Sequence, residues 1–308
     1  MHLNILRRLP RPSIWLLAAI SLLPAQQPAR TGQDVRMLVT LEPKRGKTIP
    51  AVEPQDIKVY EDQQLRPVTG FTPATGSLQL LLMIDNSANI TFDTEIPELK
   101  RFLNSLPPQA EVAVGYMFNG LTQLTAKFTR DHAAAANAIR LPYGIGGADV
   151  SPYDSLSYAI KHWPEAQAER REVVMVSSGI EGLGGGFIPE NPYVMAGIHD
   201  AQKAGIVVYS IWSPSVGHWG HDYWMRTWGI NFLGELSDAT GGELYWTTLT
   251  APVSFAPYLQ SILTHLEHQF ILRFEPLPER PGLQPVRVLI PQKDASVAYP
   301  SAVYVSRR

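Results

Sequence analysis

Three short side chains that carry an oxygen follow the most apolar stretch of the chain. Asp85, Ser87 and Asn89 come directly after residues 78–84, LQLLLMI. A spacing of two residues lets one tight loop aim all three oxygens at one point, and such ligands suit a hard divalent cation such as Mg²⁺. Side chains of these types also cap the N-termini of helices, which is their commoner use. Taken alone, the pattern leaves two interpretations open: a Mg²⁺ site and a helix cap.

The elements around this pentapeptide indicate an α/β fold. Apolar runs typical of buried parallel strands alternate with segments of helical pattern across residues 77–268. This alternation predicts a doubly wound, mostly parallel, Rossmann-like sheet. Ligands of such sheets bind beyond the carboxyl ends of the strands, which is where Asp85 begins its loop. The expected strands are 78–84, 112–118, 173–176 and 206–211, and the expected helices are 95–106, 131–140, 153–162, 193–204, 232–240 and 255–266.

β-structure is predicted on both sides of the α/β domain. Strand patterns occur near residues 35–41 and 57–60 in the N-terminal β-segment, residues 30–76, and near 270–274 and 286–290 in the C-terminal β-segment, residues 269–308. We expect these two segments to pack together as a small β-domain. Within the α/β domain, Asn119-Gly120 predicts a hairpin between 112–118 and a further strand at 121–128.

The first residues have the pattern of a secretory signal. Arg7, Arg8 and Arg11 precede the apolar run 14–23, IWLLAAISLL. Ten residues are too few to cross a membrane, because a spanning helix needs about 20. Residues 1–29 are therefore predicted to be a signal peptide, with an uncleaved anchor as the alternative. The expected location is outside the cell or in the periplasm or cell envelope, without a stable transmembrane span.

Composition excludes several classes of function. The 308 residues contain no cysteine, so disulfides, thiolate zinc sites, iron–sulfur clusters and thiol catalysis are ruled out. Lys and Arg number 26 against 28 acids; without the three leader arginines the balance is 23 − 28 = −5, which argues against a nucleic-acid partner. The glycine run 182–186 lacks the G-x-G-x-x-G spacing, so no nucleotide cofactor is expected. No P-loop, Gly-x-Ser-x-Gly elbow or His-Glu-x-x-His motif occurs.

Five segments in the same order resemble the von Willebrand factor type A domain of secreted bacterial proteins. LLMIDNSAN resembles the strand and D-x-S-x-S loop of the family's metal-ion-dependent adhesion site, and VVMVSSG (173–179) resembles the strand and Thr-Asp-Gly turn. Residues 55–71 resemble the family's leading β-segment, and residues 270–290 resemble its closing hairpin. The fifth segment, Gly146-Gly147 with Tyr153-Asp154-Ser155-Leu156, resembles the Gly-Gly-Thr-x-x-Tyr-Asp-x-Leu loop. The resemblance covers most of the chain beyond its leader and implies the family's α/β fold.

The metal site implied by the resemblance is degenerate. Asn89 stands where the family has a third hydroxyl, the metal-binding threonine falls on Ala148, and the distal aspartate falls on Ser178. Asp149 or Ser151 could substitute for the threonine if the longer loop folds inward. Because hard cations are held largely by ligand charge, we expect Mg²⁺ to bind weakly or not at all.

The predicted function is that of an exported, non-enzymatic adhesion-type module. It would bind an unidentified protein partner through the loop edge at Asp85–Asn89, with or without a weak Mg²⁺ ion. One alternative is a metal-free structural or assembly component of the cell envelope. The other is a secreted metal-dependent hydrolase that uses His218 and His221, which lie in a Trp-rich stretch.

Overall fold

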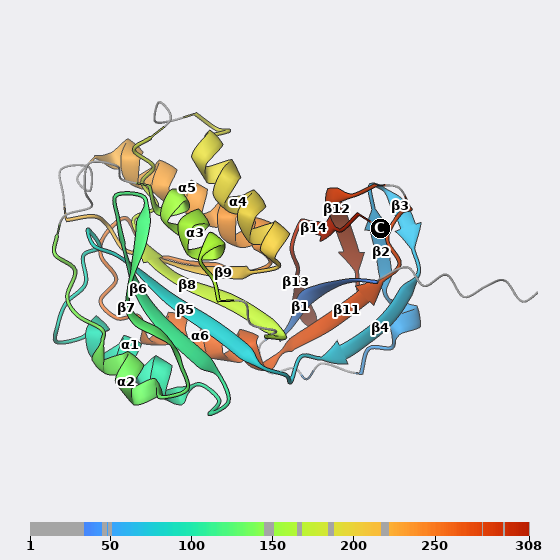
Figure 1. Ribbon diagram of the computed structural model, residues 1–308, viewed down its shortest axis with the longest axis horizontal. Helices are drawn as coiled ribbons and strands as arrows, with labels where there is room; N and C mark the ends of the chain where they lie inside the picture. Colours follow the sequence, from blue (N-terminus) through green and yellow to red (C-terminus); the bar gives the residue numbers. More distant parts are fainter. Residues whose placement is uncertain are drawn as a thin grey trace, which may run out of the picture. The chain divides into compact units, whose positions relative to one another are not determined.

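The computed structural model (Figure 1) describes nine stretches of the chain: residues 34–44, 48, 51–144, 151–164, 168–183, 188–216, 222–278, 280–291 and 293–307. Several sequence predictions fall outside them, namely the signal peptide 1–29, Gly146 to Asp149, most of the glycine run, and His218 and His221. No helix among the described residues combines the length and apolar character that crossing a membrane requires.

A six-stranded sheet forms the centre of the α/β domain, in the order β10-β9-β8-β5-β6-β7. The first five of these strands run parallel, and β7 pairs antiparallel with β6. This topology confirms the predicted doubly wound, mostly parallel fold. The strands are β5 (Leu78–Asp85), β6 (Glu111–Phe118), β7 (Leu121–Thr129), β8 (Arg170–Ser177), β9 (Val207–Trp212) and β10 (Leu244–Tyr245).

Six helices among the described residues cover the two faces of the sheet (Figure 1). Residues of α1, α2 and α6 pack in the core on one face, and residues of α3, α4 and α5 pack in the core on the other. The helices are α1 (Glu95–Ser105), α2 (His132–Asn137), α3 (Pro152–Lys161), α4 (Pro192–Ala204), α5 (Tyr223–Thr240) and α6 (Ala256–Glu267).

Strand β5 is apolar on both faces because it lies between these two cores. Leu80, Leu82 and Ile84 enter the core beside α1, while Leu81 and Met83 enter the core on the opposite face. Successive side chains of a strand point to opposite faces, so a covered central strand is apolar at most positions. The buried Gln79 is an exception in β5, and its side chain donates a hydrogen bond to Glu111. All eight residues of β5 are buried, including Asp85 at its end.

The hairpin between β6 and β7 is confirmed. Phe118 pairs with Leu121, and the two residues between them, Asn119 and Gly120, have φ angles of 50° and 67°. Two consecutive positive φ values define the tight turn that matches strand twist, and Asn and Gly adopt them with least strain.

Two four-stranded sheets are built from strands of both ends of the described chain, as predicted for the small β-domain. They share one core that includes Val39, Leu41, Val59, Leu272 and Val288. Their orders are β13-β1-β11-β4 and β14-β12-β2-β3. The bounds are β1 (Val35–Pro43), β2 (Lys58–Glu61), β3 (Gln64–Arg66), β4 (Val68–Pro73), β11 (Gln269–Phe274), β12 (Gly282–Leu289), β13 (Ala295–Ala298) and β14 (Ala302–Val305), with a 3₁₀ turn η1 (Pro54–Asp56) before β2.

Helix α5 begins nine residues before the predicted start at Phe232. Asp222 caps it by accepting a hydrogen bond from the Met225 N–H at 2.9 Å. Gly229 lowers the helical signal of this segment, but packing requires a glycine there. A Cβ atom on Gly229 would lie 2.2 Å from the carbonyl oxygen of Ser178. The first half of α5 is therefore pressed against the loop that follows β8.

The buried Glu172 of β8 should make the protein less stable as the pH rises. Burial raises the pKa of this carboxyl group from 4.5 to about 7, with Arg170 acting in the opposite direction. Because the native state holds this proton more tightly than the unfolded chain, its contribution to stability is present at low pH and is lost between about pH 4.5 and 7. Glu172→Gln should flatten this fall by up to about 3 kcal/mol of unfolding free energy.

Urea unfolding between pH 5 and 8 measures this effect. Glu267→Gln, at an exposed position on α6, is the matched control and should keep the wild-type profile. If Glu172→Gln has the same pH dependence as wild type, the buried carboxyl group does not titrate as inferred.

Candidate functional site

The carboxylate of Asp85 lies buried at the carboxyl end of β5 and is surrounded by hydrogen-bond donors. Its Oδ1 accepts from both the backbone N–H and the hydroxyl of Ser87, at 2.8 Å each, and its Oδ2 accepts from the hydroxyl of Ser177 at 3.0 Å. Burial raises the pKa of Asp85, whereas these bonds and one from the Ser178 backbone act in the opposite direction. Donors from its own loop and from β8 thus satisfy the carboxylate.

Backbone hydrogen bonds fix the loop that carries these residues. The Ala88 N–H donates to the Asp85 carbonyl at 3.0 Å and closes a tight turn. The Asn86 N–H donates to the carbonyl of Met117 at the end of β6, and the Asn89 N–H donates to the carbonyl of Pro214 after β9. The loop is therefore attached to the end of β6 and to the segment that follows β9, so it is held against the rigid sheet.

Two of the three predicted side chains meet, and the third does not. Asp85 and Ser87 are bonded to each other, whereas the side chain of Asn89 is exposed. Neither Asp85 nor Ser87 caps the following helix, because α1 begins at Glu95 with Thr94 in the N-cap position. The helix-cap interpretation is therefore wrong for this loop.

Ser151 turns into the protein, but its partner is a glutamate that the sequence analysis missed. Its hydroxyl donates to Oε2 of Glu181 at 2.6 Å and accepts from the N–H of Asp154, which caps α3. Burial raises the pKa of Glu181 to about 7, although the bonds from Ser151 and from the Leu183 N–H act in the opposite direction. The available signal was that Glu181 is the first acid after β8, four residues beyond the end of the strand.

The residues around Asp85 do not fit a resident Mg²⁺ ion. Both acceptor positions of Oδ1 are taken by Ser87, and Oδ2 is bonded to Ser177. The position of a second carboxylate is occupied by Ser178, and the side chain of Asn89 lies exposed. A hard cation needs charged oxygens with free lone pairs, whereas here protein donors already stabilise the single carboxylate.

The arrangement does not form a hydrolytic triad either. Ser87 donates its proton directly to a carboxylate. Among the hydrogen bonds of the described residues, none joins a histidine to Asp85 or Ser87, and a triad needs that intervening base. The geometry is that of a loop held in one conformation by its own hydrogen bonds.

Removing the Asp85 carboxylate should destabilise the fold in the absence of any metal. Asp85→Ala leaves the Ser87 N–H and the Ser177 hydroxyl buried without their acceptor, and each such group costs about 1–3 kcal/mol. We expect a loss of about 2–4 kcal/mol in unfolding free energy, measured by urea titration in EDTA. Asn89→Ala, in the same loop but exposed, should stay within about 0.5 kcal/mol of wild type.

Millimolar Mg²⁺ completes this experiment. The melting temperature of the wild-type chain should be the same with and without the ion, because Ser87 and Ser177 already donate hydrogen bonds to the two oxygens of the single carboxylate. A rise with Mg²⁺ that Asp85→Ala abolishes would show that the ion displaces the serine donors, and the metal-free description of this loop would be wrong.

No protein-family model and no curated protein sequence matches the chain. Solved structures, in contrast, do match the chain. A von Willebrand factor type A protein from Catenulispora acidiphila has 11% identity and a TM-score of 0.44, and the match covers 89% of this chain and 74% of that one.

Two further solved structures show the same kind of similarity. The conserved hypothetical protein BatB from Bacteroides thetaiotaomicron has 14% identity and a TM-score of 0.43, covering 62% of this chain and 97% of that one. The ArnB paralog VWA2 from Sulfolobus acidocaldarius has 8% identity and a TM-score of 0.40, covering 88% and 76%. The solved structures similar to this chain thus include von Willebrand factor A domains, the family that its sequence motifs resemble.

Proposed function

We propose that this chain is a non-enzymatic module that binds a protein partner through the loops at the carboxyl edge of its parallel sheet, without a resident divalent ion. The loop of Asp85–Asn89 lies at the middle of this edge, because β5 is a central strand. We refer below to the loops and helix starts beyond the carboxyl ends of β5, β6, β8, β9 and β10 as the loop edge.

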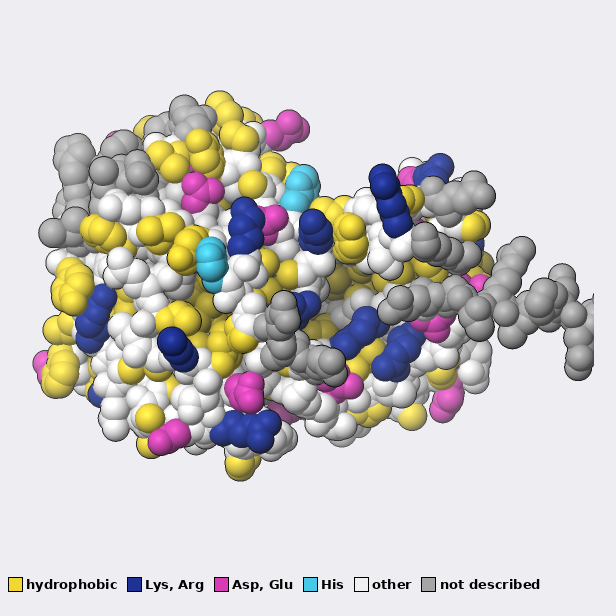
Figure 2. Space-filling view, in the orientation of Figure 1, with side chains coloured by type: hydrophobic (Ala, Val, Ile, Leu, Met, Phe, Trp, Pro, Cys, Tyr) yellow, Lys and Arg dark blue, Asp and Glu magenta, His cyan; other side chains and the backbone are white. Residues whose placement is uncertain are grey.

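The distribution of exposed hydrophobic side chains carries the proposal. Fourteen large hydrophobic side chains are exposed among the described residues, and four of them, Leu65, Leu124, Leu289 and Tyr304, lie elsewhere. The remaining ten lie on the loop edge: Phe92, Leu121, Leu141, Tyr143, Ile188, Val216, Tyr223, Trp224, Trp246 and Val253. Figure 2 shows hydrophobic side chains along the left side of the view, where these loops lie in Figure 1. A one-sided concentration of this kind marks an interaction surface.

The types of these side chains favour a protein as the partner. Tyr143 is 71% exposed and Trp224 is 66% exposed. Tyr and Trp are enriched at protein interfaces and supply much of their binding energy, because they bury a large area at a small entropic cost. The net charge of −2 does not favour a nucleic acid as the partner.

An arginine connects the Asp85 loop with this aromatic surface. The guanidinium of Arg140 lies 3.8 Å from the ring centroids of both Tyr116 and Tyr143, and its Nη1 donates to the side-chain oxygen of Asn86 at 3.1 Å. The Gly144 N–H donates to the Asn86 carbonyl at 2.8 Å. Tyr143 is thereby held in place before binding, which lowers the entropic cost of recognising a partner.

Truncating the aromatic side chains should weaken partner binding and leave the fold intact. Tyr143→Ala and Trp224→Ala should each weaken the affinity by about tenfold or more, as expected at an interface hot spot. Leu65→Ala is the matched control, because Leu65 is 58% exposed but lies on β3, away from the loop edge. A partner would be isolated from envelope extracts with the wild-type chain, and its affinity for each variant would then be measured with both proteins purified. Equal affinities for all three variants would contradict the proposal.

Export to the cell envelope or beyond is part of the same proposal. It is supported by the arginines and the ten-residue apolar run at the N-terminus, together with the absence of reactive thiols. Mass spectrometry of the chain recovered from cells should show that about the first 29 residues have been removed, with the cut near Ala29. Recovery of the uncleaved chain from the membrane fraction would favour the anchor alternative.

A further inference from the structure

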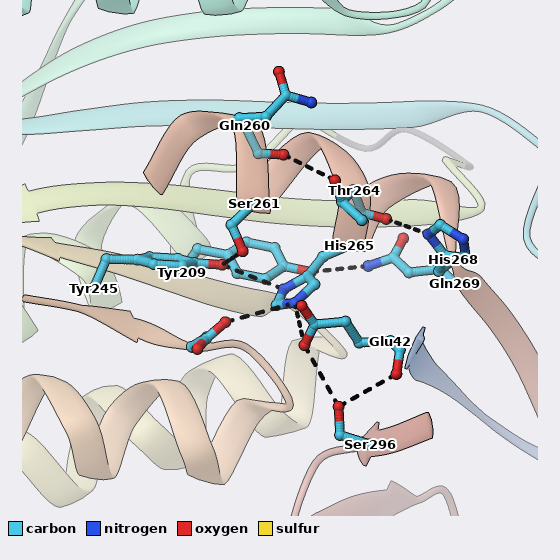
Figure 3. Close-up of polar contacts among 11 residues, drawn as sticks. Glu42, Tyr209, Tyr245, Gln260, Ser261, Thr264, His265, His268, Gln269 and Ser296 are labelled. Carbon is cyan, nitrogen blue, oxygen red and sulfur yellow. Dashed lines mark hydrogen bonds and ion pairs between the residues drawn. The ribbon is translucent and has the colours of Figure 1, made fainter. Parts of the chain in front are cut away.

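Three metal-ligating side chains meet at the edge of the sheet opposite to the loop edge. Glu42 lies on β1, Glu243 directly precedes β10, and His265 lies in the last turn of α6. One ligand atom from each lies within 4.8 Å of the other two. The chain brings these residues together from three distant segments, and Figure 3 shows Glu42 and His265 pointing toward each other.

The imidazole of His265 has one nitrogen bonded and the other unsatisfied. Its Nδ1 lies 3.3 Å from the hydroxyl of Tyr245, and that hydroxyl donates to Oγ of Ser261 at 3.3 Å. When Nδ1 carries the proton and donates to the tyrosine oxygen, the lone pair is on Nε2. Nε2 is buried and has no hydrogen-bond partner among the described residues.

The unsatisfied nitrogen faces two carboxylates. Nε2 of His265 lies 3.2 Å from Oε2 of Glu42 and 3.5 Å from Oε2 of Glu243. A lone pair directed at two anionic oxygens is repulsive unless a cation lies between them. Among the described residues, neither glutamate forms an ion pair with a lysine or arginine, and His265 is the basic group that lies beside both.

The spacing of the three ligand atoms suits a tetrahedral ion. Zinc binds imidazole nitrogen and carboxylate oxygen at about 2.0–2.2 Å, which places neighbouring ligands of a tetrahedron about 3.3 Å apart. The distances from Nε2 of His265 to the two glutamate oxygens, 3.2 and 3.5 Å, lie on either side of this value. The second nitrogen of a zinc-bound histidine almost always has a hydrogen-bond partner that fixes the orientation of the ring. The hydroxyl of Tyr245 is this partner for Nδ1 of His265.

The surroundings also favour a cation with access to solvent. The side chain of His265 is 6% exposed, whereas those of Glu42 and Glu243 are 41% and 48% exposed, so water can reach a fourth position. His265 lies at the C-terminal end of α6, where the helix dipole attracts positive charge. A set of one imidazole and two carboxylates selects a transition ion over Mg²⁺, which prefers oxygen ligands alone.

We propose that Glu42, Glu243 and His265 bind a divalent transition ion of the zinc class, with water as the remaining ligand and Tyr245 orienting the imidazole. This site is separate from the loop edge and does not depend on the proposed function. Because its ligands come from β1, the start of β10 and α6, the ion would fasten the β-domain to the α/β domain and stabilise the native state.

The test is a titration of the metal-stripped full-length chain with Zn²⁺, followed calorimetrically, and with Co²⁺, whose visible absorption reports a tetrahedral site. Glu243→Gln and Glu42→Gln should each weaken Zn²⁺ binding by more than about 100-fold, since loss of an outer partner alone costs about 10–100-fold. Tyr245→Phe, which removes only the orienting hydroxyl, should weaken it by about 10–100-fold.

Matched variants separate this site from other sources of binding. Glu267→Gln and His268→Gln alter an acid and a histidine near the end of α6 outside the cluster, and both should bind Zn²⁺ as the wild type does. His221→Ala tests the second histidine-containing stretch and should also retain binding at the cluster. Zn²⁺ should raise the melting temperature of the wild type and not of Glu243→Gln.

Two results would overturn the proposal. If the wild-type chain binds no Zn²⁺ at micromolar concentration, the three residues form only a histidine–carboxylate ion pair. If binding is undiminished in Glu243→Gln but lost in His221→Ala, the ion belongs to the His218/His221 stretch.

Discussion

The burial of β5 on both faces is the constraint from which the candidate site follows. A central strand covered by two helical layers is apolar at most positions, and Asp85 lies at the point where β5 leaves the core. Its carboxylate is still within the protein and must be satisfied there. Ser87 and Ser177 supply the hydrogen bonds, which joins the loop after β5 to the end of β8.

The hydrogen bonds from Ser87 and Ser177 change which ligands the Asp85 loop can bind. In a metal-binding version of such a loop, the carboxylate oxygens would face an ion; here they face serine donors, and Glu181 is likewise bonded to Ser151. Charged groups at the loop edge are thus used to hold its loops together. The surface that remains for a partner is aromatic and aliphatic, with Tyr143 and Trp224 among its most exposed members.

At the opposite edge of the sheet, the charged groups are more exposed and less fully hydrogen-bonded. At Glu42, Glu243 and His265 the acids are partly open to solvent, and a buried nitrogen lacks a hydrogen-bond partner. Both carboxylate oxygens at the loop edge accept hydrogen bonds from serines, whereas in this cluster two carboxylates and an unbonded imidazole nitrogen lie together without a lysine or arginine among the described residues. That difference, and not the number of acidic residues, distinguishes a self-contained hydrogen-bonded loop from a candidate ion site.

The sequence by itself determined the order of strands and helices, because apolar runs and turn residues are local signals. It predicted the parallel sheet and the turn at Asn119, and the flanking strands of the β-domain. It did not predict the start of α5, where Gly229 lowers the helical signal but is needed for close packing. Only the tertiary structure decided which polar groups meet. Residues 42, 243 and 265 share no local pattern, and whether Asp85 faces an ion or a serine depends on Ser177, which is 92 residues away in the chain.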